Sequence, residues 1–127
     1  MRPRPRLAVL SHSAIEPTHA AKWSQVAAAG WEVLLLVPSR WPEAGRWQAA
    51  RTRRSGRLRV EPVAGVFAGR LARWTPIGLA ARLREFSPTL IHAEEEPYVM
   101  ACWTAAQWAR RAGVPFTFFT WENIHRA

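Results

Sequence analysis

Several residue types are scarce or missing in this chain of 127 residues, and each absence removes a class of function. There is no aspartate, and cysteine and lysine occur once each, as Cys102 and Lys22. A single cysteine excludes a disulfide framework within the chain and argues against a cysteine-based zinc site. The longest apolar run, from Val33 to Val37, falls far short of the ~20 residues that cross a membrane as a helix.

Short motifs that mark common catalytic and nucleotide-binding sites are absent as well. The first predicted strand, residues 6–11, is followed neither by a GxGxxG turn nor by a P-loop, so the usual dinucleotide and nucleoside triphosphate sites are missing. No GxSxG elbow occurs, which disfavours a serine hydrolase. His12, His92 and His125 have glutamates nearby, but without HExxH spacing or aspartate a metal site is not expected.

The residues that are present indicate one folded and strongly basic domain. Hydrophobic residues make up 49% of the sequence, which argues against disorder, and the length suits a single domain over residues 1–127. The formal net charge of +9 favours contact with nucleic acid, anionic lipid or phosphorylated small molecules. Because no RNA- or DNA-binding module accompanies the charge, nucleic acid is not an expected partner.

The amino terminus has the outward form of a secretory signal. Arg2, Arg4 and Arg6 precede an apolar run, but Ser11 ends that run before it reaches the ~7–15 residues of a signal-peptide core. We therefore expect a cytoplasmic protein whose positive charge allows peripheral contact with the inner face of the membrane.

Hydrophobic periodicity alternates between strand and helix along the chain. Strands are predicted at 6–11, 31–37, 58–63, 89–93 and 114–120, and helices at 17–29, 75–86 and 98–111. This order predicts an α/β fold, a Rossmann-like parallel β-sheet of about five strands with helices on both faces and the first strand in a central position. Pro62 suits an edge strand at 58–63, and residues 38–56 are predicted to form a surface excursion with weak helical character.

Three consecutive carboxylates, residues 94–96, follow a strand that reads as buried. Leu90 and Ile91 give this strand its apolar character, and Pro97 suits the first turn of the helix that follows. The carboxylates are then expected between a strand's carboxyl end and a helix's amino end, where open α/β sheets bind ligands and where the helix dipole favours negative charge. The alternative is that one or two of the glutamates only cap the helix and the others are solvated.

Polar side chains gather at the carboxyl ends of the predicted strands. A compact fold would bring them together in a polar site suited to a hydroxyl-rich ligand, because carboxylates and amides hydrogen-bond hydroxyl groups. The residues expected to contact such a ligand are His12, Arg40, Glu94, Glu95, Glu122 and Asn123. His92, by contrast, is expected to point into the sheet as a hydrogen-bonded core histidine.

The stretch 40–59 is rich in arginine and contains Trp41 and Trp47. One interpretation is a membrane-contacting loop, with arginines on phosphates or lipid headgroups and the tryptophans anchored at the interface. The other interpretation is a solvated loop whose tryptophans pack on the domain, which is the usual fate of a charge-rich segment.

Six short segments, spread over nearly the whole chain, match the order of motifs in a known protein family. They are residues 6–12 (RLAVLSH), 22–23 (KW), 30–38 (GWEVLLLVP), 88–98 (PTLIHAEEEPY), 109–115 (ARRAGVP) and 119–124 (FTWENI). In this order, and especially through its Glu-Glu-Pro and Thr-Trp-Glu-Asn blocks, the sequence resembles the N-terminal, acceptor-side domain of GT-B glycosyltransferases of the family-4 group.

The resemblance implies hexosyl transfer from a nucleotide-sugar to a sugar or lipid acceptor, with retention and without a metal. The lack of aspartate agrees, since it rules out the DxD metal motif of the other large glycosyltransferase class. The N-terminal domain would shape the acceptor pocket, and a C-terminal domain would bind most of the nucleotide-sugar, so no further cofactor is expected in this chain.

The sequence departs from the family pattern at three points. The loop after the first strand lacks a Gly-Gly pair, Thr120 and Trp121 stand where the family often has a histidine, and the C-terminal domain does not follow. We therefore expect a fragment of a transferase that is inactive alone. The alternative is a non-catalytic interaction module that docks through the stretch 40–59 to a membrane surface or a partner chain.

Overall fold

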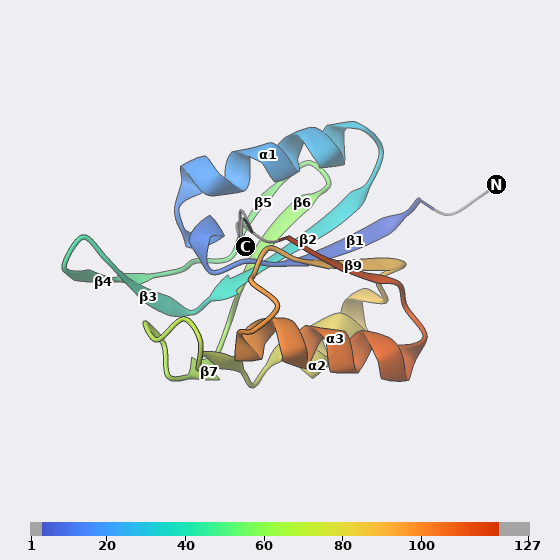
Figure 1. Ribbon diagram of the computed structural model, residues 1–127. Helices are drawn as coiled ribbons and strands as arrows, with labels where there is room; N and C mark the ends of the chain where they lie inside the picture. The colour runs from blue at the N-terminus through green and yellow to red at the C-terminus, as the bar shows by residue number, and fades with distance from the viewer. Residues whose placement is uncertain (1–3, 120–127) are drawn as a thin grey trace, which may run out of the picture.

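The computed structural model describes residues 4–119, and within them six strands form one central sheet (Figure 1). Their order across the sheet is β10 (Phe116–Phe118), β9 (Leu90–Ala93), β1 (Arg6–Leu10), β2 (Glu32–Pro38), β6 (Leu58–Val63) and β5 (Arg53–Ser55). Neighbouring strands are parallel except β5, which runs antiparallel to β6. The predicted α/β fold with a central β1 is confirmed. The sheet is nevertheless mixed, and has six strands where about five parallel ones were predicted.

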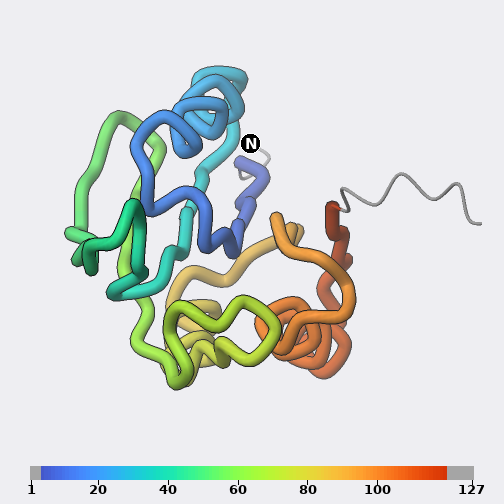
Figure 2. The backbone as a smooth tube through the Cα atoms, turned by 60° about the vertical axis from the view of Figure 1, so that its left-hand side comes forward, coloured from blue at the N-terminus to red at the C-terminus, as the bar shows by residue number. Residues whose placement is uncertain are grey.

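The described residues form three α-helices, which cover both faces of the sheet (Figures 1 and 2). Helix α1 (Pro17–Ala28) lies on one face, and α2 (Leu79–Phe86) and α3 (Met100–Ala112) lie on the other. Side chains alternate between the two faces along a strand. Leu7 and Val9 of β1 therefore pack in the core under α1, whereas Ala8 and Leu10 pack in the core under α2 and α3.

Strand β2 is buried along nearly its whole length. Every residue from Val33 to Pro38 is buried, and the strand pairs with β1 on one side and β6 on the other. A continuous apolar run is typical of a parallel strand covered on both faces. The predicted burial of this segment is confirmed.

Strand β6 is not the sheet edge that was predicted. Strand β5 pairs with the first half of β6, where Ser55 is opposite Leu58 and Arg53 is opposite Val60. Strand β5 is therefore the edge of the sheet. Pro62 lies beyond the end of β5 and pairs only with Val37 of β2. Pro62 has no N–H to donate, but no strand lies on its other side to accept one. Proline is therefore tolerated here for the same reason that it is tolerated at a sheet edge.

Residues 38–56 have no helical character, so that prediction is wrong. Strands β3 (Arg40–Glu43) and β4 (Arg46–Ala49) form an antiparallel hairpin in place of a helix. Its turn residues Ala44 and Gly45 both have positive φ, the geometry of a two-residue turn that matches the twist of paired strands. Trp41 of β3 is buried and packs edge-on against Trp74, which draws the hairpin's base onto the domain.

The segment before α2 is a second short antiparallel pair, β7 (Gly65–Val66) with β8 (Thr75–Pro76). A helix was predicted from residue 75, but Thr75 and Pro76 belong to β8 and α2 begins only at Leu79. Ile77, predicted to face inward, is 67% exposed for the same reason, because it precedes the helix.

Helix α3 begins later than predicted, at Met100. A turn closed by the Val99 N–H and the Glu96 carbonyl separates it from β9. Pro97 lies in this turn and not in the first helical turn, and no acidic residue occupies that first turn. The glutamates after β9 are therefore not helix caps. Within residues 4–119 no helix is long and apolar enough to cross a membrane.

Candidate functional site

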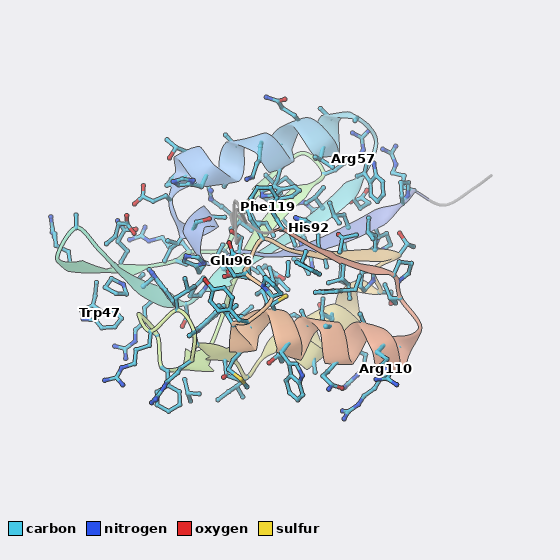
Figure 3. All side chains as sticks on the ribbon, viewed as in Figure 1. Trp47, Arg57, His92, Glu96, Arg110 and Phe119 are labelled. Carbon is cyan, nitrogen blue, oxygen red and sulfur yellow. The ribbon has the colours of Figure 1, made fainter. Side chains whose placement is uncertain are left out.

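A cavity of about 380 Å³ opens at the carboxyl ends of β1 and β9. Its polar lining includes side chains of the loop after β1, of α1 and of the loop after β9, among them His12, Ser13, Lys22, Glu94 and Glu95. Glu96 and Phe119 also line it, and Figure 3 shows both between the helical layers at this end of the sheet. We refer to this space as the polar pocket.

Sheet register explains why segments more than 80 residues apart meet here. Leu10, the last residue of β1, pairs with Ala93, the last residue of β9. The Glu94 N–H then donates to the Leu10 carbonyl at 2.8 Å. Because both strands run parallel and end together, the polar residues that follow them project at the same edge. The predicted meeting of these two loops is confirmed.

Glu95 holds His12 in place. The Glu95 side chain is fully buried, and one of its oxygens accepts the backbone N–H of His12 at 2.7 Å. Nδ1 of His12 lies 2.9 Å from both carboxylate oxygens. An ionised carboxylate only accepts hydrogen bonds, so Nδ1 carries a proton and Nε2 is the ring atom left to meet a ligand. The ring is also in tilted contact with Trp41, and one quarter of the His12 side chain is exposed.

Glu94 is the centre of a second polar group. One oxygen accepts the Ser11 hydroxyl at 2.6 Å, and Ser13 lies 3.1 Å from Ser11 through their hydroxyl oxygens. The other oxygen pairs with Lys22, the single lysine of the chain, which reaches across from α1. The Glu94 side chain is 9% exposed and Lys22 is 56% exposed. A ligand hydroxyl could therefore exchange for the lysine contact more easily than for the serine contact.

Two titratable groups beside the pocket are shifted by burial. Burial lowers the pKa of His92, with Glu94 opposing the shift and Lys22 adding to it. Burial also raises the pKa of the Cys102 thiol to about 11, and the charges of Glu95 and Glu96 add to that shift. Neither side chain lines the pocket.

His92 is hydrogen-bonded within the sheet, as predicted. Its Nδ1 lies 2.8 Å from the Thr117 hydroxyl of β10, and its ring contacts Trp23 of α1. The residue is only partly buried, so the predicted core position is not confirmed.

The predicted ligand contacts divide into three groups. His12, Glu94 and Glu95 meet in the polar pocket. Arg40 does not, because its guanidinium group lies 4.5 Å above the ring of Trp47 on the exposed hairpin. Glu122 and Asn123 lie outside the described residues.

Sequence reasoning missed Ser11, Lys22 and Tyr98 as parts of this site. Ser11 was taken only as the end of a strand, yet it is fully buried and hydrogen-bonded to Glu94. Lys22 was quoted only within the six-segment resemblance, because its ion pair with Glu94 joins residues far apart in the sequence. A lone lysine in an arginine-rich chain was the available signal.

The site combines hydrogen-bond donors with hydrogen-bond acceptors. Carboxylate, imidazole, hydroxyl and ammonium groups converge on one cavity, and together they offer both donors and acceptors. Over residues 4–119, no three His, Cys or Glu side chains lie close enough to hold a metal ion.

Comparisons with protein-family models, with curated proteins and with solved structures found no match to this chain. An assignment of function therefore depends on the residues of the chain itself.

Proposed function

We propose that the chain is the acceptor-side domain of a metal-independent glycosyltransferase of the GT-B type, in the family-4 group. The substrate bound in the polar pocket would be the acceptor of a hexosyl group. The nucleotide-sugar donor would be bound mainly by a second domain of the enzyme, so residues 1–127 would bind acceptor without transferring sugar to it.

The observation that carries this proposal is the convergence of His12, Glu94 and Glu95 on one cavity at the carboxyl ends of β1 and β9. Sugars present several hydroxyl groups, each of which both donates and accepts hydrogen bonds. Glu94 accepts from a ligand hydroxyl, and Nε2 of His12 is positioned to accept from another while Glu95 orients the ring. The six-segment sequence resemblance supports the same assignment.

The pocket also suits the reactivity that an acceptor needs. A hydroxyl group attacks a sugar donor more readily when a neighbouring base takes its proton, and a histidine oriented by a carboxylate is a common base of this kind. Glu95 would act as a positioning residue, since its buried carboxylate is hydrogen-bonded to His12.

Ligand-observed NMR of the purified chain tests this proposal. Saturation transfer to maltose and to other common hexosides is expected for the unaltered chain, and is expected to fall at least about ten-fold in occupancy for Glu94→Gln, which removes a charged acceptor. Glu85→Gln, on the exposed side of α2, is the matched control and should leave transfer unchanged. Equal transfer to both variants, or none to any hexoside, would count against sugar recognition.

A second candidate function rests on the β3–β4 hairpin. Trp47 is 57% exposed there and carries the Arg40 guanidinium group against its ring, while Arg51, Arg53 and Arg54 are exposed nearby. Exposed indole and guanidinium groups together suit an anionic membrane surface. In this alternative the chain is a non-catalytic module that docks to a membrane or to a partner chain.

Liposome sedimentation separates the two functions. Vesicles containing anionic lipid should retain the chain, and replacement of Arg51, Arg53 and Arg54 by glutamine should release it, if the hairpin region docks to membranes. Absence of sedimentation with the unaltered chain would exclude the membrane version and leave the acceptor-binding proposal unaffected.

A further inference from the structure

Two more hollows continue from the polar pocket along helix α3. Tyr98 lines the polar pocket and also a neighbouring hollow of about 260 Å³ that includes Met100 and Trp103. Trp103 in turn lines a groove of about 240 Å³ between α2 and α3. Each pair of neighbouring spaces shares one lining residue, Tyr98 for the first pair and Trp103 for the second.

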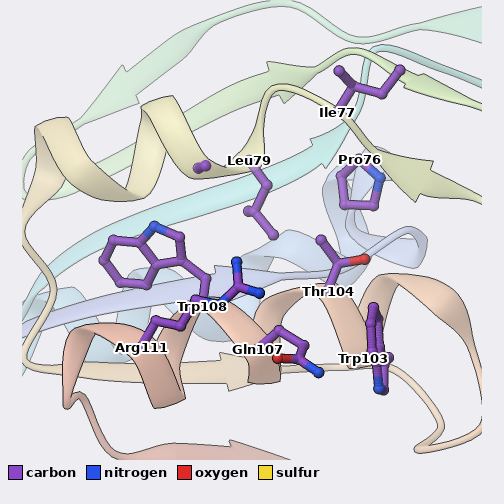
Figure 4. A pocket seen from close by; sticks show the side chains of 9 residues that line it. Pro76, Ile77, Leu79, Trp103, Thr104, Gln107, Trp108 and Arg111 are labelled. Atoms are coloured by element: carbon purple, nitrogen blue, oxygen red, sulfur yellow. The ribbon is translucent and has the colours of Figure 1, made fainter.

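The carboxylates line only the first of the three spaces, although the groove at the far end also includes Thr104, Gln107 and Arg111. The polar pocket carries the carboxylates and His12, whereas the middle hollow is formed by Pro97, Tyr98, Val99, Met100 and Trp103. The groove beyond it has Leu79, Ile77 and Trp108 among its apolar side chains, and Figure 4 shows Trp103 and Trp108 on either side of Thr104 with Leu79 above it.

The same path carries much of the exposed apolar surface of the described residues. Ile77 is 67% exposed, Tyr98 64%, Trp103 56% and Met100 40%. A contiguous set of large exposed apolar side chains usually marks a binding surface, because leaving it in water is unfavourable. Its position beside the mouth of the polar pocket ties it to whatever that pocket binds.

We infer that the acceptor is an amphiphile, with a sugar head in the polar pocket and a hydrocarbon tail along the path from Tyr98 through Trp103 into the groove between α2 and α3. This inference rests on the proposed function for its head group, and it adds the substrate class. The tail runs along α3 from Met100 towards Arg111, a distance of about 17 Å at the helical rise, which accommodates a medium-length alkyl chain.

Calorimetric titration of the full chain tests the inference with three probes, each kept below micelle-forming concentration. Dodecyl maltoside has head and tail, maltose has the head alone, and dodecylphosphocholine has the tail with a head that is not a sugar. Trp103→Ala and Ile77→Asp alter the tail path at exposed positions. Phe67→Ala is the control, because Phe67 is an exposed aromatic residue (54%) that lines none of the three spaces.

The expected result is one-to-one binding of dodecyl maltoside, tighter than maltose, and weakened about ten-fold by Trp103→Ala and by Ile77→Asp. Phe67→Ala should leave the affinity unchanged. Equal effects of Trp103→Ala and Phe67→Ala, or no binding of either dodecyl compound, would overturn the inference.

The three probes keep this inference distinct from the proposed function. Binding of maltose, with dodecyl maltoside no tighter and insensitive to Trp103→Ala, would reject the tail path while supporting the sugar pocket. Trp103-dependent binding of dodecylphosphocholine, with no added affinity from a maltose head, would support the tail path and reject the sugar pocket.

Discussion

Nδ1 of His12 lies 2.9 Å from both oxygens of the Glu95 carboxylate, although the two residues are 83 positions apart in the chain. The carboxylate is fully buried while one quarter of the imidazole side chain is exposed. The pair therefore has an inner member that orients and an outer member that faces the cavity. The same carboxylate therefore fixes the backbone of the loop after β1 and the orientation of the His12 ring in the polar pocket.

Removal of the Glu95 carboxylate should destabilise the fold. In Glu95→Ala the backbone N–H and the ring N–H of His12 both lose their acceptor in a poorly solvated place, which we expect to cost about 1–3 kcal/mol. Urea denaturation followed by tryptophan fluorescence measures the change. Glu85→Ala, at an exposed position of α2, is the control, and an equal midpoint for the two variants would contradict a structural role for Glu95.

Gly65 should not tolerate a side chain. A Cβ at this position would lie 2.5 Å from the Thr75 carbonyl oxygen and 2.7 Å from Nε1 of the buried Trp74. Both neighbours are held, one by the β7–β8 pairing and one by the core, so we expect Gly65→Ala to cost about 1–3 kcal/mol. Gly78→Ala is a matched control, because its Cβ would meet Val63 at an ordinary 3.5 Å. Thermal unfolding of both variants gives the comparison.

Cys102 should make the protein less stable in alkaline solution. Its thiol titrates near 9.0 when unfolded, whereas burial and the nearby Glu95 and Glu96 raise the pKa to about 11 in the fold. As the pH rises through this window the unfolded state loses a proton that the folded state keeps, so the free energy of unfolding falls. Cys102→Ala should unfold with a shallower pH dependence over the same range. Denaturant midpoints at several pH values measure it, and parallel curves would refute the assignment.

His92 should make the protein less stable on acidification. Burial lowers its pKa in the fold from the usual 6.5, so the unfolded state takes up a proton first as the pH falls. Stability associated with this group is therefore present above 6.5 and lost below it. Between about pH 7.5 and about pH 5.5 the urea midpoint of His92→Gln should fall less than that of the unaltered chain. The other histidines are present in both proteins, so the comparison isolates position 92. An equal fall in both would show that His92 does not contribute.

The sequence by itself determined the elements whose signals are local. The unbroken apolar run of β2 and the alternation of helix and strand predicted the α/β fold and the central place of β1. The carboxylates after β9 and His12 after β1 were expected at one edge, because parallel strands end together.

Only the tertiary structure decided how the polar edge is used. Arg40 was expected in the site, but cation–π contact with Trp47 holds it on the hairpin. Lys22 was not among the expected ligand contacts, yet α1 brings it onto Glu94. Side-chain partners of this kind depend on which faces of distant elements come together. Hydrophobic periodicity and residue propensity describe only neighbouring residues, so they cannot predict contacts between side chains on distant elements.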